Sequence, residues 1–180
     1  AGSDDVVVEK LRKLRWVGMD KDTNTRFSGG ERPWEYDILE LGFKYNMNDL
    51  CASIGLVQLS KLDNMNRSRR RIVELYNAGF CNENWLKLPV EIKDNVNAYW
   101  LYVLRVEDGN RDELMEYLYQ KEILTNTNFK PIHLLSYYKE YYLKRKIKVN
   151  CQISEKEWGK IVVLPLFPNI PLEVTEKIIE

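Results

Sequence analysis

The sequence predicts a mixed α/β (α+β) chain in which one long helix precedes a small sheet covered by helices. Three observations predict this class. Leucines and small residues recur at helical spacing through residues 48–80. Short segments rich in aromatic and β-branched residues follow, as in strands. Amphipathic segments alternate with these strands, which is the pattern of helices packed on a sheet.

The first third of the chain predicts one helix followed by irregular structure. Residues 4–16 carry apolar side chains at i, i+4 and i+7 with acidic residues at the start, so they predict a helix. Residues 18–33 are polar and contain glycine, which predicts a loop, and a loop of this length is usually functional or mobile. Residues 34–43 contain bulky β-forming residues and predict a short strand or an extended segment.

The long helix has a recognisable start and two unusual faces. Asn48 is a good N-cap, and the periodic pattern continues to about Phe80. Ala52 and Gly55 lie on a face of small residues, which would suit close packing either at an interface or on the core of the same chain. The four arginines within residues 67–71 could bind phosphate groups, but such a run more often forms a solvated helix face with packed stems.

The remaining residues predict alternating strands and helices. The predicted elements are a strand at 98–106, a helix at 111–122, a strand at 123–129, a turn or short helix after Pro131, a helix from about Ser154, a buried strand ending at Pro165, and a final helix with Pro171 near its first position. This order predicts a layer of helices on a small sheet.

Composition excludes several classes of protein. The 180 residues contain 27 basic and 27 acidic side chains, so nothing in the net charge suggests binding to nucleic acid or to an anionic membrane. No apolar run approaches the ~18 residues of a membrane helix, and the first residues do not resemble a secretory signal. Three widely spaced cysteines favour a reducing, cytoplasmic setting. With one histidine and no CxxC pair, we expect no metal site.

Few residues suggest chemistry by themselves. His133 could serve as the base of a nucleophilic triad, but no Gly-x-Ser-x-Gly elbow is present, so a hydrolase is disfavoured. A satisfied, partly buried histidine is the simpler interpretation. The pair Gly29-Gly30 forms no phosphate-binding or dinucleotide fingerprint. Lys44 lies shortly before the start of the long helix, where the helix dipole would help it to hold an anion.

Several segments together resemble one family. They are GMDKDT, WEYDILELGFKYNMNDLCASIGLVQLSKLD, RRRIVELY, LYVLRV, RDELMEYL, FKPIHLLSYYKEYY and VVLPLFP. In this order they resemble the DegT/DnrJ/EryC1/StrS family of nucleotide-sugar aminotransferases, which depend on pyridoxal phosphate. The resemblance covers nearly the whole chain, and the block from Phe43 to Leu59 carries it most specifically.

The resemblance implies a position within a larger enzyme. The 180 residues match the C-terminal portion of an aminotransferase of fold type I. Residues 1–48 would be the end of the large-domain region with an active-site loop, and residues 49–180 would be a long interface helix and the small C-terminal α/β domain. The lysine that forms the Schiff base lies, in the family, ahead of the matched part, so no catalytic residue is assigned here. We therefore expect this chain alone to lack transaminase activity.

The resemblance also implies roles for particular residues. Lys44 and Asn46 match the turn that each subunit extends into the neighbouring active site, and would bind the cofactor there. His133 matches a position near the nucleotide-sugar. Arg26, in the long loop, could meet a substrate phosphate through its planar fork, although an unbound, exposed arginine is the simpler interpretation. Asn128 stands where relatives often have histidine, so substrate identity does not carry over from the family.

The function implied is transfer of an amino group from glutamate to a keto nucleotide-sugar, in a cytoplasmic homodimer with shared active sites. Two alternatives stay open. One is a sugar dehydratase of the same family, in which the Schiff-base lysine is replaced. The other is a non-catalytic binding or dimerisation fragment, which would need no pyridoxal phosphate.

Overall fold

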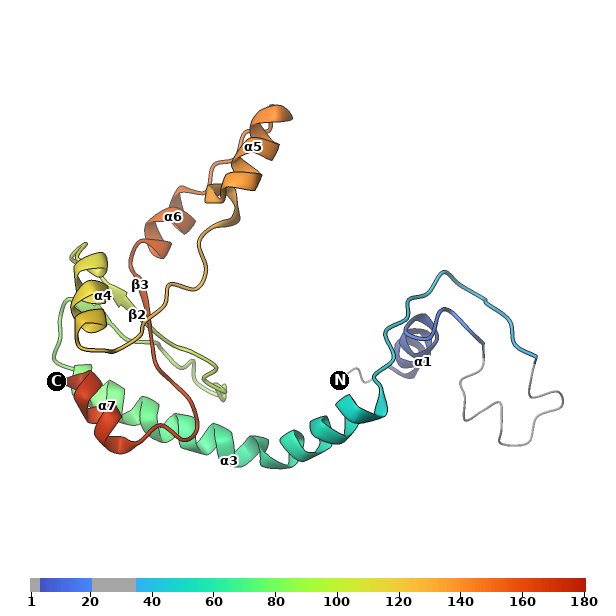
Figure 1. The fold of residues 1–180 in the computed structure, drawn as a ribbon, viewed down its shortest axis with the longest axis horizontal. Helices are drawn as coiled ribbons and strands as arrows, with labels where there is room; N and C mark the ends of the chain where they lie inside the picture. The colour runs from blue at the N-terminus through green and yellow to red at the C-terminus, as the bar shows by residue number, and fades with distance from the viewer. Residues whose placement is uncertain (1–3, 21–34) are drawn as a thin grey trace. The chain divides into compact units, whose positions relative to one another are not determined.

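The structure is a computed structural model and describes residues 4–20 and 35–180. The chain divides into two compact units, Ala1–Ser60 and Lys61–Glu180. The boundary lies within one long helix, α3 (Asp49–Phe80) (Figure 1). Mixed helices with a small antiparallel sheet confirm the predicted fold class.

The first unit begins with α1 (Asp5–Leu14), which confirms the predicted first helix. Asp4 is its N-cap, and the carboxylate accepts hydrogen bonds from the amides of Val6 and Val7. The chain then turns at Gly18, whose φ is +77°. Among the described residues of this unit, Gly18 is the only one that is buried. The described part of the unit therefore has no hydrophobic core of its own.

Residues 35–48 run in extended form past the end of α1, although they form no continuous strand. They make single antiparallel bridges, between Met19 and Ile38 and between Trp16 and Lys44. The extended form that the sequence predicted for 34–43 is present in the described residues, but the bridges do not continue into a ladder. The predicted loop at 18–33 lies mostly outside the described residues.

The second unit contains a three-stranded antiparallel sheet with strand order β1-β2-β3. The strands are β1 (Leu86–Lys87), β2 (Tyr102–Val106) and β3 (Ile161–Leu164). Tyr102 pairs with Leu164, and Leu86 pairs with Val106. Along β2 the buried side chains alternate with partly exposed ones, so one face of the sheet belongs to the core.

Helices cover the sheet and complete the core of the second unit. They are the C-terminal part of α3, α4 (Arg111–Gln120) and α7 (Leu172–Ile179). Figure 1 shows α7 along the end of α3, where Gly79 allows close contact with Ile179. Tyr76 and Tyr102 are fully buried, with ring centroids 4.9 Å apart. Their hydroxyls have partners, because Tyr76 donates to the carbonyl of Pro165 and Tyr102 to Oδ1 of Asn77.

The segment between α4 and β3 carries three short helical elements. They are the 3₁₀ turn η1 (Ile132–Leu134), α5 (Ser136–Lys144) and α6 (Gln152–Trp158). Figure 1 shows α5 and α6 extending away from the sheet. None of these three elements contains a buried residue.

One predicted strand is absent, and another, at 98–106, is present as β2 but begins later than predicted. Residues 123–129 form no strand, and only Asn126 bridges to Val163 of β3. The Asn126 side chain accepts a hydrogen bond from the next amide, Thr127, and such local bonds compete with a ladder. Residues 98–101 also lie outside β2, because Tyr99 has a φ of +45° and its amide donates to the side chain of Asn97.

Two further properties concern membranes and metals. In residues 4–20 and 35–180, no helix combines the length and the apolar character needed to cross a membrane. Within the same residues, no group of three or more histidine, cysteine, aspartate or glutamate side chains could hold a metal ion.

Candidate functional site

Hydrogen bonds to the C-terminal end of α1 hold the backbone around Lys44 in place. The amide of Phe43 donates to the carbonyl of Leu14, and the amide of Tyr45 donates to that of Arg15. In extended backbone, neighbouring side chains point to opposite sides. The rings of Phe43 and Tyr45 stack with centroids 5.0 Å apart, so they occupy one side of the segment. The Lys44 side chain is therefore directed to the other side.

Trp16 is the aromatic partner of Lys44. The Lys44 ammonium lies 3.6 Å from the centroid of the Trp16 ring, which is cation–π distance. Within the described part of the chain, no carboxylate lies within ion-pair distance of Lys44. Lys44 and Asn46 are both exposed. The ring fixes the cation without neutralising its charge, so the ammonium can still bind an anion.

The start of α3 contributes less to an anion site than the sequence suggested. Asn48 caps the helix as predicted, since its Oδ1 accepts a hydrogen bond from the amide of Cys51 at 2.9 Å. Asp49 adds a negative charge to the first turn. Both groups satisfy the helix N-terminus within the chain. Any anion at this place would depend on Lys44 rather than on the helix dipole.

His133 lies on η1 in the second unit and has a carboxylate partner. Its Nε2 lies 2.9 Å from Oε1 of Glu155, which belongs to α6. The His133 side chain is 14% exposed and that of Glu155 is 44% exposed. His133 is thus partly buried and has a hydrogen-bond partner. The ring still has a second nitrogen, Nδ1, for which the structure gives no partner among the described residues.

The predicted site residues are distributed over both units. Lys44 and Asn46 are two residues apart in the first unit, and His133 belongs to the second, so each is described within its own unit. Arg26 lies outside the described residues. The sequence did not indicate the two supporting side chains, Trp16 and Glu155. Both are far in sequence from the residues that they contact, and no local pattern signals such pairs.

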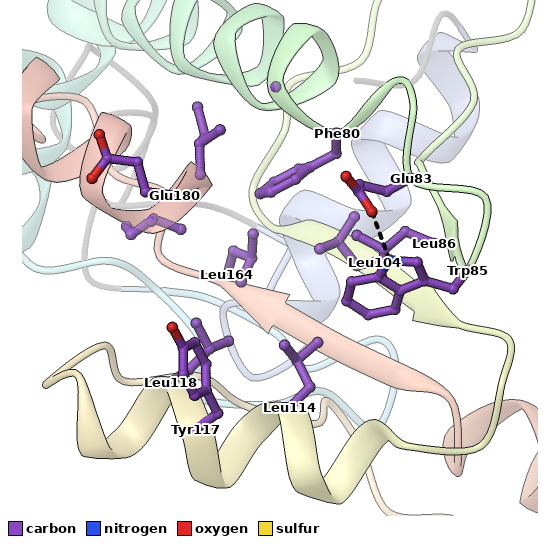
Figure 2. A pocket seen from close by; sticks show the side chains of 13 residues that line it. Phe80, Glu83, Trp85, Leu86, Leu104, Leu114, Tyr117, Leu118, Leu164 and Glu180 are labelled. Carbon is purple, nitrogen blue, oxygen red and sulfur yellow. Dashed lines mark hydrogen bonds between the residues drawn. The ribbon is translucent and has the colours of Figure 1, made fainter.

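The second unit also contains an apolar cavity of about 260 Å³. Figure 2 shows it between the end of α3, α4, β2, β3 and α7, with Phe80, Leu104, Leu118 and Leu164 around it. At one side the indole of Trp85 donates to Glu83 at 2.7 Å. None of the predicted site residues lines this cavity. Because most of the lining side chains belong to the hydrophobic core, we assign the cavity to the fold and not to the site.

The N-terminal part of α3 presents an apolar surface to solvent. Its exposed side chains include Leu50, Ile54, Leu56, Val57 and Leu59, each more than half exposed. A Cβ built on Gly55 would meet no atom within 4 Å. This face of the helix therefore has room for a neighbouring surface beside Gly55.

Comparison with known proteins identifies the family. Residues 2–180 match the model of the DegT/DnrJ/EryC1/StrS aminotransferase family. The chain belongs to this family. The resemblance carried by the motifs is thereby confirmed over almost the whole sequence.

Several known proteins resemble the chain in sequence or in fold. The uncharacterized protein MJ1066 of Methanocaldococcus jannaschii is 34% identical over 170 residues, which cover 91% of this chain and 43% of that protein. The aminotransferase TlmJ of Streptoalloteichus hindustanus has a TM-score of 0.77 at 27% identity, covering 98% of this chain and 44% of its own. The candidate sugar aminotransferase Spr1654 of Streptococcus pneumoniae, in its PLP form, has a TM-score of 0.77 at 26% identity, covering 99% and 43%. The chain thus spans less than half the length of these relatives.

Proposed function

We propose that these 180 residues are the C-terminal part of a pyridoxal-phosphate-dependent aminotransferase that moves an amino group from glutamate to a keto nucleotide-sugar. The observation that carries this proposal is the family match over residues 2–180. Spr1654, similar to this chain at 26–28% identity, was solved in PLP, PMP and apo forms, which supports the cofactor. Pyridoxal phosphate would supply the electron sink for amino transfer.

Lys44 and Asn46 fit the phosphate of this cofactor. Lys44 is a compact exposed cation that has no carboxylate partner among the described residues, so its charge is available to an anion. Asn46 follows two residues later in the exposed extended segment, and its amide can donate a neutral hydrogen bond. Lys44 would neutralise the phosphate, and Asn46 would help to orient it. We propose that both act on the cofactor of a partner subunit.

His133 and Arg26 are proposed to serve the nucleotide-sugar. His133 is partly exposed and keeps one ring nitrogen for a ligand. Arg26 would pair with a phosphate of the nucleotide through its planar fork. The Schiff-base lysine and most groups around the cofactor ring would come from the part of the enzyme not spanned by this chain.

Two features support an assembly of two subunits. The apolar surface on the N-terminal part of α3 would expose leucine and isoleucine side chains unless another surface covers it. The open space beside Gly55 would let a second helix approach closely. We propose a homodimer that uses this surface. A cytoplasmic location is part of the proposal, and the three free cysteines support it.

A transamination assay on the full-length enzyme tests the proposal. Glutamate, pyridoxal phosphate and a panel of keto nucleotide-sugars are supplied, and the product is identified by mass spectrometry. We expect 2-oxoglutarate and an amino sugar nucleotide in equal amounts. Loss of a sugar hydroxyl without nitrogen transfer would favour a dehydratase. Absence of any reaction across the panel, with cofactor bound, would contradict the aminotransferase assignment.

A further inference from the structure

The contact between His133 and Glu155 joins two elements far apart in the sequence. His133 is on the short turn η1, and Glu155 is on α6, which immediately precedes β3. The Nε2–Oε1 distance of 2.9 Å is a hydrogen bond. The imidazole is 14% exposed and its partner is 44% exposed. The ring is therefore largely enclosed, and this carboxylate is the hydrogen-bond partner that the structure gives it.

The chemistry of the pair determines which ring nitrogen carries the proton. An ionised carboxylate only accepts hydrogen bonds, so Nε2 must be the nitrogen that donates. In the neutral ring this leaves Nδ1 without a proton and with a free lone pair. A side chain held in this way offers an acceptor to a hydroxyl or amino group of a ligand. Rotation or a change of tautomer would break the bond to Glu155.

We propose that Glu155 is a positioning residue, which holds the His133 ring and fixes its Nε2–H tautomer so that His133 meets the substrate through Nδ1. This inference rests on the proposed function for the substrate role of His133. Glu155 itself does not contact the substrate in this account. Its effect on the reaction would pass entirely through the imidazole.

The ring can be observed directly, because His133 is the single histidine of these 180 residues. In the full-length enzyme labelled with ¹⁵N-histidine, the signals that disappear in His133→Ala are those of this ring, and we expect among them a proton on Nε2 that exchanges slowly enough with water to be detected. In Glu155→Ala this proton signal should disappear and the two nitrogen shifts should move towards a mixture of tautomers. Glu155→Gln should keep the Nε2–H, since an amide oxygen also accepts. Lys156→Ala, an exposed neighbour on α6, is the matched control and should leave the spectrum unchanged.

Kinetics of the full-length enzyme test whether Glu155 affects the reaction through His133. Glu155→Ala should lower kcat/KM for the nucleotide-sugar roughly tenfold, as expected for loss of a charge-assisted hydrogen bond. The double variant with His133→Ala should be no slower than His133→Ala alone, and Glu155→Gln should recover most of the rate. A purely structural role would instead lower the melting temperature and give additive losses.

The two arms separate failure of this inference from failure of the proposed function. An imidazole spectrum that is unchanged in Glu155→Ala would overturn the positioning role, whatever the enzyme does. A wild-type rate for Glu155→Ala beside a slow His133→Ala would overturn it as well. Full activity of His133→Ala would refute the substrate role and the use of Nδ1, while the spectra would still decide whether Glu155 fixes the ring.

Discussion

At the scale of single residues, the Lys44 ammonium contacts an aromatic ring and has no acidic partner among the described residues. The Trp16 ring lies under the ammonium at 3.6 Å. Replacing Lys44 by alanine in the full-length enzyme should weaken pyridoxal phosphate binding roughly ten- to hundredfold, because a charge-assisted hydrogen bond contributes about 1.5–3 kcal/mol. Asn46→Ala should cost less, about 0.5–1.5 kcal/mol, since a neutral amide makes a weaker bond.

Titration of the cofactor absorbance measures these affinities. Lys93→Ala, an exposed lysine in a loop of the second unit, is the control and should bind the cofactor like the wild type. Equal affinity of Lys44→Ala and wild type would remove Lys44 from the cofactor site.

The ionisation of Glu107 should make the stability of the folded chain depend on pH. The hydrogen bond from Lys160 is the main cause that holds the pKa of Glu107 below its ordinary value of 4.5, and the charge of Arg105 assists. Because the folded state favours the ionised carboxylate, the contribution of Glu107 to the stability of the fold is fully present at pH values above the ordinary pKa of 4.5. It is lost as the pH falls through the lowered folded-state pKa. The free energy of unfolding should therefore fall on acidification more steeply in wild type than in Glu107→Gln.

Denaturant unfolding from pH 7 down to acid measures this difference. Glu107→Gln should be less stable at pH 7, and the gap should narrow as the pH is lowered. Glu122→Gln, an exposed residue without an ion pair within the described ranges, should follow the wild-type curve. A gap that stays constant with pH would show that Glu107 does not act through its charge.

Residue roles were predictable from the sequence where the partner is close along the chain. Asn48 caps the helix through the amide of Cys51, three residues away. The pairs of Lys44 with Trp16 and of His133 with Glu155 span 28 and 22 residues. Only the fold brings such side chains together, so no local pattern could indicate them.

At the scale of elements, the turn after α1 depends on close packing of backbone. A Cβ on Gly18 would lie 1.9 Å from the carbonyl oxygen of Glu40, and the φ of +77° is itself unfavourable for a side chain. Gly18→Ala should therefore destabilise the bridges that hold the segment before α3. The positive φ alone costs a side chain about 1–2 kcal/mol, and the clash with Glu40 adds to that cost. Gly55→Ala places its Cβ in open space within the chain and should leave these bridges intact.

Hydrogen exchange measures the effect at the amides that report on this turn. Leu39 donates to the carbonyl of Gly18, and Phe43 donates to that of Leu14. Both amides should lose protection in Gly18→Ala and keep it in Gly55→Ala. Unchanged protection in Gly18→Ala would contradict the structure of this turn.

Helices and strands were predicted correctly where the hydrophobic periodicity of the sequence is strong. The long helix α3 and the final helix α7 have sustained periodicity with clear starts, and both are present. The two-residue strand β1 is too short to give a pattern. Residues 123–129 have strand-forming composition, but a side-chain bond at Asn126 limits pairing to one bridge. Composition alone does not report that competition.

At the scale of the whole molecule, the apolar surface on the N-terminal part of α3 predicts association. Leu56 is 70% exposed and Leu59 is 67% exposed, and the described residues of the first unit have no buried hydrophobic side chain. The 180-residue chain made alone should be oligomeric, aggregated or only marginally stable. Analytical ultracentrifugation measures the state of association. Leu56→Glu should reduce association, whereas Leu124→Glu, also exposed but in the second unit, should not.

A monodisperse monomer with a sharp, high melting transition would contradict the need for a covering partner.

The 180-residue chain alone should show no transaminase turnover with added pyridoxal phosphate. Borohydride reduction followed by peptide mapping should find no stoichiometric attachment to any of its lysines, because we propose that the Schiff-base lysine belongs to the rest of the enzyme.

We propose that Lys44 and Asn46 complete an active site that is shared between two subunits. Subunits carrying Lys44→Ala are mixed with subunits that lack the Schiff-base lysine, and transaminase activity of the full-length heterodimer is measured. If Lys44 binds the cofactor of the partner subunit, one active site of the heterodimer lacks both Lys44 and the Schiff-base lysine, and the other site has both. Activity should then return to as much as half of the wild-type value per dimer. No recovery would contradict the claim, provided that heterodimers form and that Lys44→Ala homodimers are impaired.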